Sequence, residues 1–216
     1  MNKLLSLLIV FLFSFAMMGC SGNRQFVDPS WTQKPSSVKV VIANPLSYWI
    51  PKIVPEMDPM SDWFKDKVDN TFKFNTKLSY VVENIPKEQV THVAEDMDGK
   101  NIQVPKLETM SDSFEVYLIL DNVRMWLSDT SSTMDVTSPT VAQNYGPGFN
   151  VLTFKGENTK ASANYAVYES KTGKRLAYGF LEESIFHEDV AVEHGWFETV
   201  RQLVMHVIEQ TPISQF

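Results

Sequence analysis

Hydrophobic and polar positions change their spacing several times along the chain, and this spacing predicts strands in its middle part. A short β-branched run or a strict alternation of apolar and polar residues is typical of a strand. Such runs lie at 38–43, 78–82, 114–127, 161–169 and 176–186. Asp121 and Asn122 interrupt the longest run, which predicts a β-bulge there. Turns are predicted at Asp98-Gly99 and at Lys171-Thr172-Gly173-Lys174.

Two other segments have the period of an amphipathic helix. Phe64, Val68 and Phe72 recur every four residues and predict a helix at 62–75. Ser61 is the expected N-cap of this helix. The strongest period in the chain predicts a second helix at 193–210. Together these elements predict an α/β (α+β) fold, a two-layer sandwich with both helices on one face of a mixed sheet.

Three segments lack either period. Residues 84–112 and 128–148 are polar and are expected to be irregular, the second as a long loop. Residues 45–60 contain four prolines, which predict an extended apolar loop because proline disrupts helices and central strands. The large side chains of this loop either cover the core or dock a partner. The candidate partner-binding residues are Tyr48, Trp49 and Ile50.

The N-terminus contains the only strongly apolar stretch of the sequence. After Lys3, residues 4–18 carry no charged side chain. A positive charge followed by an uncharged stretch of this length is typical of a secretion signal. The stretch is shorter than the ~20 residues that a membrane-spanning helix needs. An uncleaved anchor or a core helix is the alternative.

The sequence Met17-Met18-Gly19-Cys20-Ser21 resembles a bacterial lipobox, in which a small residue precedes a lipid-modified cysteine. The resemblance implies that residues 1–19 are a lipoprotein signal peptide and that Cys20, the only cysteine, carries acyl chains such as palmitate. In enteric bacteria an aspartate after the cysteine retains a lipoprotein at the inner membrane. Ser21 stands there instead, which favours the periplasmic side of the outer membrane.

Composition divides the rest of the chain into two parts. Residues 20–37 are rich in small and polar residues and predict a flexible tether behind the lipidated cysteine. Residues 38–216 are expected to form a single α/β periplasmic domain, since 44% of the chain is hydrophobic. The chain has 19 Lys and Arg against 26 Asp and Glu, a net charge of -7, which argues against nucleic-acid binding.

Candidate chemistry is sparse. His187 and His194 lie in the densest ionisable cluster, but they are seven residues apart, whereas helical zinc sites place two histidines four apart. Asp96 begins a segment similar to a calcium loop, yet Leu107 occupies the position that requires a glutamate. Phosphate-binding glycine loops and nucleophile motifs are absent from the sequence. We therefore expect no catalytic residue, no metal and no cofactor.

The order of the predicted elements resembles that of small bacterial envelope lipoproteins with a CsgG/LpoB/TolB-N-terminal-like domain. The likeness is carried by the strand 38–43, the helix after Ser61, the strand 78–82, residues 114–123 of the longest run, the Tyr165–Lys174 hairpin and the helix 193–210. A looser resemblance to auxiliary lipoproteins of ABC-type lipid-transport systems rests on Asn44–Val54 followed by Asp62-Trp63-Phe64.

These resemblances imply an outer-membrane-anchored, non-catalytic binding or assembly module for other envelope proteins, with self-association left open. One alternative is an auxiliary lipoprotein that binds lipid or a transporter and would contain an apolar cavity between sheet and helices. A second is an envelope hydrolase, which would contain a concave pocket near His187 or His194.

Overall fold

The computed structural model describes residues 23–49, 57, 59–135, 151–187 and 193–214. The strands are β1 (Arg24–Val27), β2 (Ser37–Asn44), β3 (Ser47–Trp49), β4 (Ser79–Pro86), β5 (Val90–Met97), β6 (Lys100–Leu107), β7 (Val116–Asp135), β8 (Val151–Glu169) and β9 (Arg175–His187). The helices are α2 (Met60–Asn75), the short 3-10 helix η2 (Lys87–Gln89) and α4 (Glu193–Gln210).

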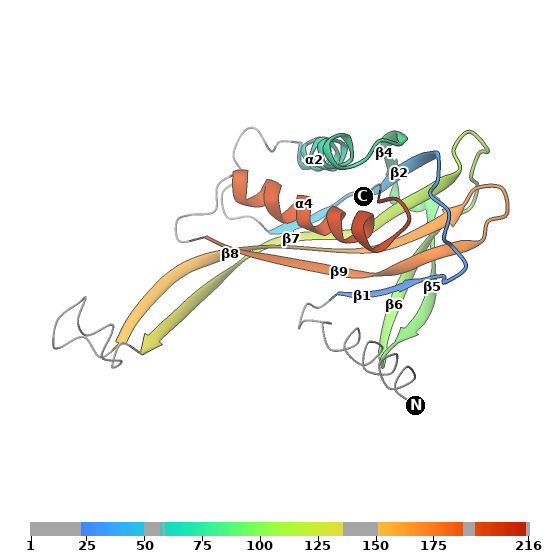
Figure 1. Cartoon of the computed structure of the whole chain (residues 1–216). Helices are drawn as coiled ribbons and strands as arrows, with labels where there is room; N and C mark the ends of the chain where they lie inside the picture. The colour runs from blue at the N-terminus through green and yellow to red at the C-terminus, as the bar shows by residue number, and fades with distance from the viewer. Residues whose placement is uncertain (1–22, 50–56, 58, 136–150, 188–192, 215–216) are drawn as a thin grey trace, which may run out of the picture.

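Seven strands form one mixed sheet in the order β1-β9-β8-β7-β2-β4, and β3 pairs with β7 beside β2. β2 runs parallel to both β4 and β7, whereas β7, β8, β9 and β1 are joined in antiparallel pairs. β5 and β6 form a separate two-stranded sheet. β7 and β8 are the longest strands, and their far ends extend beyond the rest of the sheet (Figure 1).

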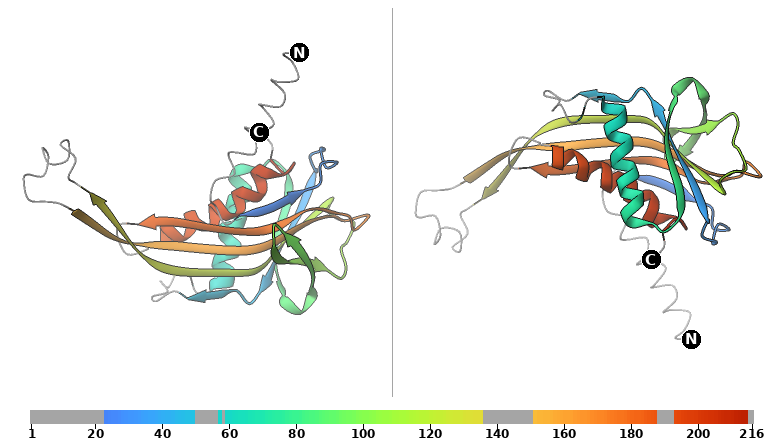
Figure 2. Two further views of the ribbon diagram at one scale, coloured as in Figure 1. Left: turned by 90° about the horizontal axis from the view of Figure 1, so that it is seen from below. Right: turned by 90° about the horizontal axis from the view of Figure 1, so that it is seen from above.

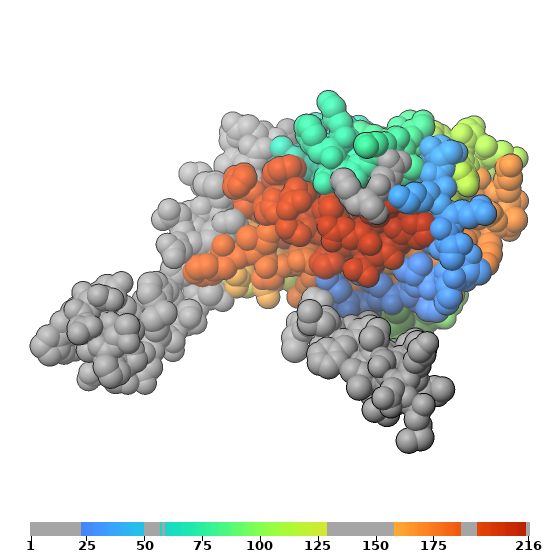
Figure 3. Space-filling model, viewed as in Figure 1, coloured from blue at the N-terminus to red at the C-terminus, as the bar shows by residue number. Residues whose placement is uncertain are grey.

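Both helices lie on one face of the large sheet, which confirms the predicted two-layer sandwich (Figures 1 and 2). The apolar faces of α2 and α4 pack onto the sheet in one core, in which Phe64, Trp196 and Leu118 are almost completely buried. In the space-filling view α4, in red, lies between α2 and the blue strand β1 (Figure 3). Neither of these helices, within the described residues, is long and apolar enough to cross a membrane.

The start of α2 differs from the prediction. The helix begins at Met60 with Pro59 as its N-cap residue, so the prediction of Ser61 as the cap is wrong. The Pro59 carbonyl accepts hydrogen bonds from the amides of Asp62 and Trp63 at 3.0 and 3.1 Å. Proline suits this place because its fixed φ is compatible with the entry into a helix, where the missing amide would have no partner.

The β5–β6 hairpin lies on the opposite face of the sheet, which we call the helix-free face (Figures 1 and 2). A second core fills the space between hairpin and sheet, with Ile102 and Val104 from β6 packed against Ile119 and Tyr168. The prediction of an irregular segment at 84–112 is therefore wrong, although the turn at Asp98-Gly99 is present and Gly99 has a positive φ of 76°.

The segment expected to be a loop at 128–148 is also partly wrong. β7 continues to Asp135, so the prediction of a loop is wrong for residues 128–135. β8 begins at Val151, ten residues before the predicted start of that strand. Residues 136–150 lie outside the described residues. The polar serines and threonines of 128–135 gave no strand signal, but pairing with β8 supplies the backbone hydrogen bonds.

The flexible tether expected at 20–37 is wrong for residues 24–27. These residues form β1, which pairs antiparallel with β9 along the edge of the sheet. Gly179 of β9 allows this approach, because a Cβ atom placed there would lie only 2.1 Å from the Arg24 carbonyl oxygen. The start of the described chain is therefore attached to the sheet.

Candidate functional site

A groove of about 510 Å³ opens on the helix-free face beside the β5–β6 hairpin. It combines two aromatic side chains with opposite charges, amides and a hydroxyl. Its lining residues are Gln103, Asn122, Arg124, Trp126, Ser162, Asn164, Phe180 and Glu182. These residues come from β6, β7, β8 and β9, which are neighbours in space and lie between residues 100 and 187 of the sequence.

A β-bulge in β7 turns three of these side chains toward the groove. Before the bulge, Leu118 and Leu120 face the helices and belong to their core. The register with β8 shifts between Asp121 and Arg124, and Asn122 adopts a left-handed φ of 49°. After the bulge, Val123 and Met125 face the helices instead. The register shift therefore confirms the β-bulge predicted at Asp121-Asn122.

The bulge decides to which face of the sheet Arg124 and Trp126 point, because side chains alternate between the two faces along a strand. A shift of one residue exchanges the two faces of everything beyond it. Without the bulge, Arg124 and Trp126 would point into the helix-covered core. With it, both side chains line the groove on the helix-free face.

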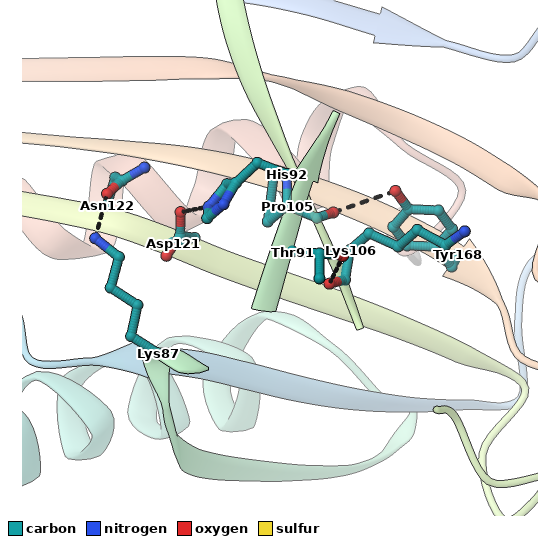
Figure 4. Close-up of polar contacts among 8 residues, drawn as sticks. All are labelled: Lys87, Thr91, His92, Pro105, Lys106, Asp121, Asn122 and Tyr168. Carbon is teal, nitrogen blue, oxygen red and sulfur yellow. Dashed lines mark hydrogen bonds and ion pairs between the residues drawn. The ribbon is translucent and has the colours of Figure 1, made fainter. Parts of the chain in front are cut away.

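Polar contacts from the hairpin side hold this bulge in place (Figure 4). Asp121 is completely buried, and its Oδ2 atom lies 2.7 Å from His92 Nε2 on β5. Lys87 Nζ on η2 donates a hydrogen bond to Asn122 Oδ1 at 3.0 Å. Asp121 Oδ1 is buried without a hydrogen-bond partner among the described residues. The hairpin therefore both bounds the groove and fixes the backbone that shapes it.

The charges of the groove lie in one cross-strand row. Arg124 of β7 is directly opposite Ser162 of β8, and Ser162 is directly opposite Glu182 of β9. Lys160 lies diagonally from both charges, opposite Trp126. None of these three charged residues takes part in an ion pair within the part of the chain that the structure describes. Ser162, in the middle of the row, is only 3% exposed.

One aromatic residue of the groove is a neighbour of the proline-rich segment 45–60, in which the sequence predicted partner-binding residues. Trp49 of β3 is paired with Trp126 of β7, so both residues lie on the same face of the sheet. Trp49 is 67% exposed and Tyr48 is 46% exposed. Tyr48 and Trp49 therefore both lie at the surface, but on opposite sides of the sheet. Trp49 faces the side of the groove, whereas Tyr48 is paired with Met125 and points to the side that the helices cover. Ile50 lies outside the described residues, as does the predicted lipidation site Cys20.

Of the two histidines that the sequence singled out, His187 is the last residue of β9, and its side chain is outside what the structure describes. His194 is exposed near the start of α4 and lines neither this groove nor a second one near the β8–β9 turn. The segment that begins at Asp96 is a polar turn with an internal hydrogen bond, in which the Gly99 amide donates to Asp96 Oδ1 at 3.1 Å. Across the described residues, no three His, Cys, Asp or Glu side chains are grouped so as to hold a metal ion.

A second polar cluster, which no pattern in the sequence predicted, attaches the N-terminal end of the described chain. His206 Nε2 on α4 lies 2.5 Å from Glu183 Oε1 on β9, and Asn23 Nδ2 donates to the same oxygen at 3.0 Å. Asn23 Oδ1 in turn accepts from the Glu182 amide at 2.6 Å. The groove strand β9 is therefore bonded to Asn23, three residues after Cys20.

This cluster shifts the pKa of both ionisable partners. The hydrogen bond with Glu183 raises the pKa of His206 above its ordinary value, against the opposing effect of burial. Burial opposes ionisation of Glu183, yet the hydrogen bonds from His206 and Asn23 outweigh it and lower the pKa of the carboxyl. Both shifts favour the charged forms and so strengthen the contact.

The chain matches no family model and no curated protein. Solved structures with a similar arrangement include a homolog of a neuraminyllactose-binding hemagglutinin from Helicobacter pylori, at 12% identity and a TM-score of 0.38, covering 83% of each chain. The PelC dodecamer from Paraburkholderia phytofirmans has 9% identity and a TM-score of 0.39, covering 90% of this chain and 97% of that one. The hypothetical protein CT253 from Chlamydia trachomatis has 10% identity and a TM-score of 0.38, covering 80% and 94%. These values assign neither a family nor a function to the chain.

Proposed function

We propose that the chain is a lipid-anchored protein of the bacterial envelope that binds other envelope proteins without catalysing a reaction. In this proposal Cys20 carries the lipid at the periplasmic side of the outer membrane. Tyr48 and Trp49 of β3 are the contact residues for the partner. The order of signal stretch, Gly19 and Cys20 supports the anchor.

One observation carries the binding role: Trp49 is exposed on a short strand and is paired with Trp126, which lines the groove. Large aromatic side chains contribute much of the binding energy in protein interfaces, and tryptophan is enriched among the dominant contacts. The fixed backbone of β3, paired with β7, lowers the entropy that such a contact costs. A single exposed aromatic residue needs no explanation, but an exposed tryptophan beside the aromatic lining of a groove favours a docking edge.

The anchor is tested by labelling cells with radioactive palmitate. Cys20→Ala should abolish incorporation, and equal labelling of both proteins would refute the anchor.

The binding edge is tested separately by a photo-crosslinking amino acid in the intact chain. Placed at Trp49, it should give a discrete crosslinked species in membranes, including a dimer of this chain if the partner is a second copy. Placed at Phe74, which is 76% exposed at the end of α2 on the other face, it should give none. Equal yields at both positions would contradict a binding edge at β3.

A further inference from the structure

The groove on the helix-free face has a charge pattern that fits a small ligand of two charges. Arg124 and Glu182 stand two strands apart in one row, which separates their Cα atoms by about 10 Å. Neither charge has an ion-pair partner among the described residues. An unpaired cation and an unpaired anion that flank one groove are complementary to a molecule with an anionic and a cationic end.

The space between the two charges is lined by polar and aromatic side chains that can contact such a ligand. Ser162 and Asn164 lie between them on β8 and provide a hydroxyl and an amide. Trp126 and Phe180 flank the row on either side. An aromatic face attracts an ammonium group, and a hydroxyl or amide bonds the oxygens of an ester or phosphate.

The two ends of the row differ in what they recognise. Arg124 presents a guanidinium fork, which bonds phosphate through two parallel hydrogen bonds, and Lys160 adds a second positive charge diagonally across β8. Glu182 presents a carboxylate that accepts hydrogen bonds from an ammonium group. The anionic end of the ligand therefore lies toward β7 and its ammonium end toward β9.

We propose that the groove binds the phosphoethanolamine group, with its phosphate at Arg124 and its ammonium at Glu182. Two carbon atoms link the charges of this group, so it is short enough to lie along a single row of the sheet. Trp126 and Phe180 enclose it laterally.

The attachment of the N-terminus points to the source of this group. Asn23 Oδ1 accepts a hydrogen bond from the amide of Glu182, in the groove row itself. Asn23 is the third residue after Cys20, and these three steps of the chain span at most ~11 Å. This step rests on the proposed lipid anchor: if Cys20 is acylated, the groove lies close to the membrane surface, where phosphatidylethanolamine presents the same headgroup.

The binding is tested on the intact chain, purified from membranes in detergent, by isothermal titration calorimetry. The ligands are phosphoethanolamine, glycerol phosphate, which lacks the amine, and phosphocholine, whose quaternary amine donates no N–H hydrogen bond. We expect phosphoethanolamine to bind roughly tenfold or more tightly than the other two, because each loses a charge-assisted contact.

Two variants separate the ends of the site. Arg124→Gln should weaken binding of both phosphoethanolamine and glycerol phosphate, whereas Glu182→Gln should remove only the preference for phosphoethanolamine. The matched controls are Lys77→Gln and Glu88→Gln, which are exposed and outside the groove. Both controls should bind as the unchanged chain does. Thermal unfolding of each variant checks that the fold is retained.

A second arm compares soluble sources with lipid. Dihexanoyl-phosphatidylethanolamine, kept below its micelle concentration, should bind at least as tightly as phosphoethanolamine if the headgroup of a lipid is the ligand. Binding of the free group alone would identify a soluble source and keep the recognition chemistry. Equal affinity for phosphoethanolamine and glycerol phosphate, or unchanged affinity in both groove variants, would overturn the proposal.

The proposed function is tested by separate measurements, so its failure can be distinguished from failure of the ligand proposal. Equal palmitate labelling of the unchanged chain and of Cys20→Ala would refute the lipid anchor, but it would not affect the calorimetry with soluble ligands. A failed titration with normal palmitate labelling and crosslinking at Trp49 would remove only the ligand.

Discussion

Trp49 lies in parallel register with Trp126, on the same face of the sheet and on neighbouring strands. This pairing joins two features that lie far apart in sequence. Trp49 belongs to the proline-rich segment that the sequence marked as a partner-binding candidate, and Trp126 lines the groove formed by β6 to β9. The exposed edge and the groove are therefore adjacent parts of one surface.

Replacing Trp49 should affect binding and leave stability nearly unchanged. Because its side chain is 67% exposed, Trp49→Ala should change the free energy of unfolding by no more than about 0.5 kcal/mol, measured by urea denaturation. Chemical crosslinking of the intact chain to its partner in membranes should fall strongly. Phe74→Ala is the control, since Phe74 is 76% exposed on another part of the surface. Equal crosslinking by both variants would contradict the proposed edge.

The bulge that shapes the groove should depend on His92. Removing the imidazole leaves the carboxyl group of Asp121 buried and without the side-chain partner that it has among the described residues. His92→Ala should lower the free energy of unfolding by roughly 3 kcal/mol, as expected when one member of a buried pair is removed. His194→Ala, at an exposed position, should change it by less than about 0.5 kcal/mol. A small effect at His92 would mean that the bulge does not depend on this contact and is held by its backbone and by the hydrogen bond from Lys87 to Asn122.

Much of the fold could be predicted because its elements carry local signals. Phe64, Val68 and Phe72 share one face of α2, and the period of α4 is equally regular. The bulge was also predictable, since Asp121-Asn122 interrupts an apolar run and asparagine tolerates a left-handed φ. In these places the local preference and the tertiary structure agree.

The missed elements depend on tertiary contacts. β5 is mostly exposed, and Pro105 within β6 argues against a strand. Proline fits there because the hairpin has only two strands, and the Pro105 carbonyl accepts a bond from the Tyr168 hydroxyl at 3.2 Å. The groove could not be predicted at all, because its residues come from four strands and the direction of Arg124 depends on the bulge.

The attachment of β1 should depend on the absence of a side chain at residue 179. A Cβ atom there would lie 2.1 Å from the Arg24 carbonyl oxygen, a backbone atom that moves only if β1 moves. Gly179→Ala should therefore separate β1 from β9 and destabilise the fold by about 1–3 kcal/mol. Hydrogen exchange should accelerate at residues 24–27 and at their partners in β9. Gly173→Ala is a contrasting change, because open space surrounds that turn and only its φ of 66° opposes the substitution.

The contact between His206 and Glu183 should make stability depend on pH in two directions. The raised pKa of His206 means that its contribution is complete below the ordinary value of 6.5 and is lost as pH rises through the folded-state pKa. The lowered pKa of Glu183 means that its contribution is present above 4.5 and is lost as pH falls through the folded-state pKa. The stabilisation is therefore greatest between about pH 4.5 and 6.5.

Urea denaturation of the unchanged chain and of His206→Gln across pH 4 to 9 measures this contribution as a difference. The two stability curves should be farthest apart near pH 5.5 and should approach each other as pH rises above 6.5, because neutral His206 no longer carries the charge that Glu183 stabilises. His194→Gln should give a curve parallel to that of the unchanged chain, since His194 is exposed. A separation between the His206→Gln and unchanged curves that stays constant with pH would mean that the imidazole stabilises α4 by packing, and its charge would then have no part in holding the N-terminal end of the chain to β9.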